Sequence, residues 1–137
     1  MKNRSELRDI IIKVLYQVYI LENTNVKYDV NTLIKEQLEI ENYFVKSSID
    51  GVLKNQEKIS KLANLYLKDW TIDRLSKVDK AILSLGIYEL MYTDTPAVVC
   101  INETIELAKK YSDLNVVKMI NAAMDAIYHN EDLNGKE

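Results

Sequence analysis

Few residues in this chain break or cross-link the backbone. Its 137 residues include one proline, three glycines and a single cysteine, Cys100. Glycine and proline mark the turns of sheet-rich proteins, so their scarcity favours long helices. One cysteine cannot form an intramolecular disulfide, which is compatible with a reducing compartment. Cys100 lies in an apolar run with no histidine near it in sequence, and we interpret it as a small buried hydrophobic residue.

Several functional classes also lack the residues they need. The chain has one histidine, His129, and no cluster of residues at metal-ligand spacing. It has no phosphate loop and no nucleophile–base arrangement. No apolar run is long enough to span a membrane, and the N-terminus has no signal-peptide pattern. These absences predict a cytoplasmic protein that is not an enzyme, holds no metal or cofactor and has no membrane partner.

The charge of the chain limits how it can bind nucleic acid. Its formal net charge is −3, so bulk electrostatics alone would not attract phosphate, and any such binding must come from a local patch. Residues 1–21 are locally basic, with four positive side chains against two negative ones. A solvated helix face and a phosphate-binding surface both explain this stretch, and charge alone does not choose between them.

The apolar residues recur with helical periodicity. They make up 47% of the chain, enough for the core of one domain. A capping box of Asn3 and Glu6 predicts a helix over 4–21, and Ser76 with Asp79 predicts another over 76–92. A short helix capped by Asp29 or Asn31 is expected to end near residue 39, and a longer one is expected over 42–68 with a possible break near Asn55. Two more are expected, one from about 99 and a last one capped by Asn115.

These patterns predict one compact all-α domain. We find no strand-like alternation of useful length, and the helical segments number six or seven. The domain is expected to span residues 1–130. The polar residues 131–137 are expected to form a frayed C-terminal tail.

One position on the predicted helix 76–92 interrupts its apolar stripe. Val78, Ile82 and Leu85 lead along one helical face to Glu89. A buried carboxylate needs a partner, so two interpretations remain. Either the stripe ends at the surface or Glu89 pairs within the chain, with Arg74 or a lysine. Alternatively, Glu89 is a surface carboxylate that awaits a cation on another protein.

Two segments have an unusual sequence. One reads DRLSKVDKAIL over 73–83 and continues to IYEL over 87–90; the other reads INETIELAK over 101–109, with Pro96 between them. Together they closely resemble the NusB family of bacterial transcription antitermination factors. Weaker similarity extends to both ends of the chain, at RD (8–9), VLYQ (14–17), DGVL (50–53) and KMINAAMD (118–125).

This resemblance implies a fold and a function. Members of the family have two small helical bundles packed together. They bind a boxA element in nascent RNA jointly with NusE, which is also a small-subunit ribosomal protein. The complex joins other Nus factors on RNA polymerase and suppresses premature termination, especially on ribosomal RNA operons. The resemblance therefore implies a scaffold rather than an enzyme. Some members self-associate, so a homodimer remains possible.

The resemblance also implies which residues form two binding surfaces. The RNA-binding surface would consist of Lys2, Arg4, Arg8, Tyr66, Lys118 and Met119. The NusE-binding surface would consist of Tyr16, Asp79 and Glu89, and NusE would supply the cation for Glu89. Ser5 and Glu6 stand where the family commonly has basic residues. RNA binding by the chain alone is therefore expected to be weak and to depend strongly on NusE.

Two other functions are compatible with the resemblance. A helical protein-interaction module that binds NusE or itself, with little RNA affinity, fits the sparse arginines. Ribosomal RNA cytosine methyltransferases carry a NusB-like domain ahead of a catalytic one. A chain ending at Glu137 leaves no room for a cofactor-binding sheet, so methyl transfer is not expected.

Overall fold

Seven α-helices and one short 3-10 turn make up the described part of the chain, which contains no strand. The structure is a computed structural model and describes residues 2–133, 135 and 136. No helix in these ranges is both long and apolar enough to cross a bilayer. In chain order the elements are α1 (Arg4–Leu21), α2 (Val30–Gln37), α3 (Tyr43–Lys54), α4 (Gln56–Tyr66), η1 (Ile72–Arg74), α5 (Lys77–Tyr92), α6 (Ala97–Tyr111) and α7 (Leu114–Asn130). The predicted all-α class is confirmed.

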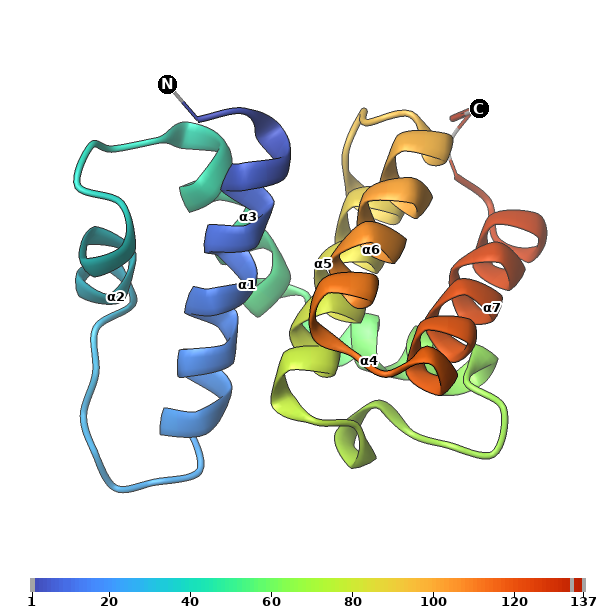
Figure 1. The fold of residues 1–137 in the computed structure, drawn as a ribbon, viewed down its shortest axis with the longest axis horizontal. Coiled ribbons are helices and arrows are strands. Elements are labelled where there is room, and N and C mark those ends of the chain that lie inside the picture. The colour runs from blue at the N-terminus through green and yellow to red at the C-terminus, as the bar shows by residue number, and fades with distance from the viewer. Residues whose placement is uncertain (1, 134, 137) are drawn as a thin grey trace.

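The helices form two groups that meet along a seam. Helices α1, α2 and α3 lie on the left in Figure 1, and α4 to α7 lie on the right. The seam between the groups is formed by α1 and α3 packing against α5. Within the second group, α6 packs between α5 and α7. This arrangement agrees with the two packed bundles that the resemblance implied.

Helix α1 begins and ends at the predicted residues. The side chain of Asn3 accepts a hydrogen bond from the Glu6 N–H at 2.9 Å, and the Glu6 carboxylate accepts one from the Asn3 N–H at 3.1 Å. Two of the N–H groups that a helix start leaves unpaired are thereby satisfied. Asn55 separates α3 from α4, at the expected break.

Two other helix starts differ from expectation, and at a third the predicted capping box forms only in part. The side chain of Asp113, rather than Asn115, caps α7 by accepting from the Val116 N–H at 3.0 Å. Helix α6 begins at Ala97, earlier than expected, with Pro96 as its N-cap; Pro96 has no backbone N–H that would need a partner there. At the start of α5, the Ser76 hydroxyl accepts from the Asp79 N–H at 3.1 Å, but the Asp79 carboxylate turns to the Ser112 hydroxyl.

The C-terminal residues contact α5, which differs from the expected frayed tail. Leu133 is buried, and the Lys136 ammonium donates to the backbone oxygens of Glu89 at 2.6 Å, Leu90 at 3.1 Å and Thr93 at 3.0 Å. The last carbonyls of a helix have no partner within it, and Lys136 satisfies them from outside. The prediction for residues 134 and 137 lies outside the described residues.

Candidate functional site

Arg8 lies in the seam between the two helix groups rather than on the surface. Its Nε donates to Oε1 of Glu89 at 2.7 Å and its Nη2 donates to Oε2 at 2.9 Å. These two bonds form a bidentate pair, the strongest geometry for an arginine and a carboxylate. A third nitrogen, Nη1, donates to Oε1 of Glu103 at 2.9 Å. Arg8 therefore ties α1 to both α5 and α6.

This pair changes the interpretation of Glu89. Glu89 is 2% exposed and Arg8 is 4% exposed, so the expectation of a surface carboxylate awaiting an external cation is wrong. The alternative of pairing within the chain is confirmed, with Arg8 in place of Arg74 or a lysine. The expected presentation of Arg8 to phosphate is also wrong, because its guanidinium is enclosed. A binding role for either residue remains a prediction.

Phe44 and Glu103 belong to this junction, although no sequence pattern singled them out for it. The guanidinium carbon of Arg4 lies 4.0 Å from the centre of the Phe44 ring, and that of Arg8 lies 5.4 Å from it. The Ser5 hydroxyl donates to Glu103. Burial opposes the charge of Arg8, but the hydrogen bonds and charges of its carboxylate partners outweigh this effect and raise its pKa above the usual value. Arg8 therefore stays charged.

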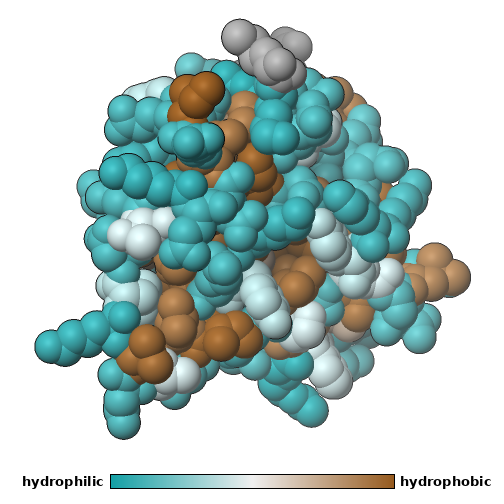
Figure 2. Space-filling view, turned by 60° about the vertical axis from the view of Figure 1, so that its left-hand side comes forward, coloured by the Kyte–Doolittle hydropathy of each residue, from teal (hydrophilic) through white to brown (hydrophobic). Residues whose placement is uncertain are grey.

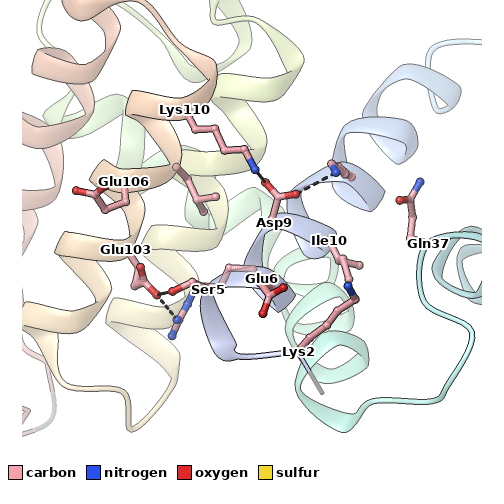
Figure 3. Close-up of a pocket in the computed structure, with 12 residues that line it drawn as sticks. Lys2, Ser5, Glu6, Asp9, Ile10, Gln37, Glu103, Glu106 and Lys110 are labelled. Carbon is pink, nitrogen blue, oxygen red and sulfur yellow. Dashed lines mark hydrogen bonds and ion pairs between the residues drawn. The ribbon is translucent and has the colours of Figure 1, made fainter.

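An open groove of about 600 Å³ runs between α1 and α6 beside this junction. Asp9 lies inside it and accepts hydrogen bonds from the Lys110 ammonium at 3.0 Å and the Tyr111 hydroxyl at 2.5 Å. Figure 3 shows Lys110 reaching across from α6 to Asp9. Lys13, one turn along α1, also pairs with Asp9 at 3.0 Å.

Among the described residues, no group of three acidic, histidine or cysteine side chains could hold a metal ion.

The carboxylate of Asp9 makes the stability of the chain depend on pH. Burial alone would raise the pKa of Asp9, but the hydrogen bonds from Tyr111, Lys110 and Lys13 outweigh it and lower the pKa. A carboxylate with a lowered folded-state pKa stabilises the fold above its unfolded pKa, which is about 3.9. This stabilisation is lost as the pH falls through the folded-state pKa.

We expect Asp9→Asn to lower the free energy of unfolding by up to about 1 kcal/mol at pH 7, because both lysine partners are exposed to solvent. The difference between wild type and variant should disappear as the pH is lowered from about 5 to below the folded-state pKa. Urea unfolding at a series of pH values measures both quantities. A difference that stays constant down to the acid limit would contradict the assignment.

The six residues expected to bind RNA are not brought together. Lys2 and Arg4 are exposed beside the start of α1, and Lys118 is exposed near the start of α7. These two helix starts lie at opposite ends of the molecule in Figure 1. Met119 is half-buried against the core. The Tyr66 hydroxyl donates a hydrogen bond to Glu131 at 2.5 Å. Glu131 follows the C-terminal end of α7, about 20 Å along the helix axis from Lys118.

The three residues expected to bind a protein partner also differ in exposure. Tyr16 is 40% exposed, whereas Asp79 is 8% exposed and accepts from the Ser112 hydroxyl. Ten residues along α5 separate Asp79 from the buried Glu89, which corresponds to about 15 Å.

Hydrophilic side chains cover most of the face in Figure 2, and apolar groups gather toward its lower edge. The exposed apolar residues at the end of α1 and in the following loop are Tyr16, Ile20, Val26 and Tyr28.

The sequence and the fold both match known proteins. The NusB family profile matches residues 5–129. The transcription antitermination protein NusB of Clostridium perfringens is 36% identical over 134 residues, covering 93% of this chain and 98% of the relative. The structure of T. maritima NusB superposes with a TM-score of 0.80 at 32% identity, covering 94% of this chain and 92% of that one. A chain in the crystal structure of antitermination factors NusB and NusE with double-stranded RNA gives a TM-score of 0.76 at 27% identity, covering 92% and 96%.

Proposed function

Because the chain belongs to the NusB family of transcription antitermination proteins, we propose that it binds boxA RNA jointly with NusE in nascent ribosomal RNA transcripts. The supporting observation is its similarity, over 92% of its length, to a chain from a complex of NusB, NusE and RNA. The complex would join other Nus factors on RNA polymerase in the cytoplasm. The comparisons give no support to a homodimer.

The charges that remain on the surface explain why RNA binding would be joint. With Arg8 enclosed by Glu89 and Glu103, the cations available from the predicted RNA surface are Lys2, Arg4 and Lys118. With three phosphate contacts to a single strand, the logarithm of the binding constant falls by only about 2 for each tenfold rise in salt concentration. Affinity must then come from NusE supplying part of the RNA surface. Linkage requires that RNA strengthens the binding of NusE by the same factor.

The two helix groups contribute different contacts in this proposal. Tyr16 is the aromatic anchor for NusE, since it is the most exposed of the three predicted partner residues, and Asp79 lies at the start of α5. Tyr66, Lys118 and Met119 contact RNA on the second group. Arg8 and Glu89 contribute by holding α1 against α5, and direct contact of either residue with RNA or NusE remains a prediction.

The proposed function is tested by fluorescence anisotropy of labelled boxA RNA, with and without the cognate NusE, against a scrambled RNA. We expect weak binding by the chain alone and tight, sequence-selective binding when NusE is present. Tyr16→Ala should weaken NusE binding at least tenfold, the effect typical of a central aromatic residue in an interface. Lys61→Met, which removes an exposed lysine from α4, serves as the control and should leave both affinities unchanged.

Two results would contradict the proposal. Tight, specific binding of boxA RNA by the chain alone would disprove the dependence on NusE. Absence of RNA binding in both conditions, with NusE still bound, would leave the second candidate function, a helical protein-interaction module. The enclosed guanidinium of Arg8 is the observation that favours this alternative, because it removes one cation from an already sparse surface.

A further inference from the structure

The segment of residues 67–76 between α4 and α5 holds the only tryptophan of the chain on the surface. Trp70 is 36% exposed. The backbone N–H of Ile72 donates to the Asn64 side chain at 2.7 Å, which fixes the segment to α4. Three buried aliphatic side chains anchor the segment to the core: Leu67, Ile72 and Leu75. Trp70 itself is not part of the buried core.

Arg74 stacks on this exposed indole. Its guanidinium carbon lies 4.3 Å from the ring centre of Trp70. Among the described residues, no carboxylate forms an ion pair with Arg74, although its neighbour Asp73 pairs with Lys80 at 3.2 Å. The guanidinium carbon of an arginine thus lies over an indole ring at the surface. Planar cationic and aromatic groups of this kind are the surfaces on which unpaired bases stack.

The backbone next to Trp70 has an unusual conformation. Asp69 has a φ of +58°, and it is the one non-glycine residue with positive φ in the described part of the chain. Side-chain-bearing residues seldom adopt this region, and aspartate is among those that tolerate it best. This turn directly precedes the residue whose ring is left exposed.

The charges around the stacked pair favour an anionic ligand. Residues 68–80 carry four cations, Lys68, Arg74, Lys77 and Lys80, against three carboxylates, Asp69, Asp73 and Asp79, and Lys80 pairs with Asp73. This stretch therefore has a net charge of +1 within a chain of net charge −3. It also lies at the same end of the second helix group as the start of α7, in the lower part of Figure 1, where Lys118 is exposed.

We propose that the Trp70–Arg74 pair is a stacking platform for an unpaired base of single-stranded RNA. The inference rests on the proposed function and extends the RNA surface to two residues outside the predicted set. An unpaired base presents a free π-face to the ring pair, and its phosphates suit the surrounding lysines. Bases within a duplex already stack on one another, so the platform selects single strands.

Because Trp70 is the only tryptophan, its fluorescence reports directly on stacking. The chain, bound to NusE, is titrated with a single-stranded boxA RNA while tryptophan emission and the anisotropy of labelled RNA are recorded. Subtracting the same titration with Trp70→Phe removes any signal from NusE. We expect the emission of Trp70 to be quenched at the RNA concentrations that raise the anisotropy. The same RNA annealed to its complement should not quench it.

Variants of the pair separate this inference from the proposed function. Trp70→Leu should weaken RNA binding about tenfold, within the range that base–aromatic stacking supplies, and should leave NusE affinity unchanged. Arg74→Lys keeps the charge but removes the plane, so it should also weaken RNA binding. Lys61→Met is the control for loss of a surface charge, and circular dichroism checks the helices of each variant.

Three outcomes would overturn the inference. RNA binding with unquenched Trp70, and unchanged affinity in Trp70→Leu, would refute the platform while leaving the proposed function intact. Loss of NusE binding in Trp70→Leu, measured without RNA, would make this segment a protein contact. Absence of RNA binding by wild type in the presence of NusE would refute the proposed function together with the platform.

Discussion

Glu89→Gln is expected to lower the free energy of unfolding by about 3 kcal/mol, because it leaves the enclosed guanidinium of Arg8 with one carboxylate partner in place of two. The amide has the shape of the carboxylate but carries no charge, so the loss measures the charge of Glu89 rather than a cavity. Urea unfolding followed by circular dichroism measures it. The change exceeds what an exposed ion pair supplies, which is usually below about 1 kcal/mol.

The double variant Arg8→Met/Glu89→Met is the matched control. Replacing both members of a buried pair by apolar side chains of similar size is often neutral, so it should recover most of the stability lost in Glu89→Gln. The pair would then be shown to be costly to break rather than needed for folding. Unchanged stability in Glu89→Gln would mean that Arg8 and Glu89 are not enclosed together.

Gly86→Ala is expected to destabilise the fold by about 1–3 kcal/mol, although alanine favours a helix by up to about 1 kcal/mol over glycine. A Cβ at residue 86 would lie 2.4 Å from Oγ1 and 2.9 Å from Cγ2 of Thr104 on α6. Thr104 is buried and cannot move aside easily, since its hydroxyl donates to the Cys100 carbonyl at 2.7 Å. Helices α5 and α6 would have to separate. Thermal or urea unfolding measures the loss.

Gly51→Ala provides the comparison for Gly86→Ala. Its Cβ would meet the end of the Tyr88 ring at 2.3 Å, but Tyr88 is only half-buried and its ring can rotate away. The loss should therefore be clearly smaller than for Gly86→Ala, and the gain in helix propensity should offset part of it. Equal losses for the two variants would show that close packing at Gly86 is not the cause.

Local signals predicted the helices well, because caps are decided by residues three or four positions apart. Asn3 with Glu6 set the start of α1, and Asn55 marked the break between α3 and α4. The start of α7 was misplaced because Asp113 and Asn115 are both good capping residues. A choice between two such neighbours depends on where the helix packs, which the local sequence does not contain.

The junction was only half predictable from the sequence. Glu89 stood out as a carboxylate on an apolar stripe. Its partner, Arg8, was expected on the RNA-binding surface and not beside Glu89. A second stripe on α1 contained the missing signal, since Arg8, Ile12, Leu15 and Tyr19 follow one helical face and all are buried. When a cation interrupts the apolar stripe of one helix and a carboxylate interrupts that of another, the two side chains are candidates for a buried pair. Glu103 and Phe44 carried no such signal, because their contacts depend on how the two helix groups are packed.

The buried arginine of α1 also sets an order of events during synthesis. Its carboxylate partners follow it by 81 and 95 residues. At translation rates of about 5–20 residues per second, Arg8 remains without Glu89 for about 4–16 s after it has been made. During that interval α1 can pair with α2 and α3 but has no counter-ion for its guanidinium. The first helix group therefore cannot reach its final state until the second has been synthesised, and contacts this distant in sequence slow folding.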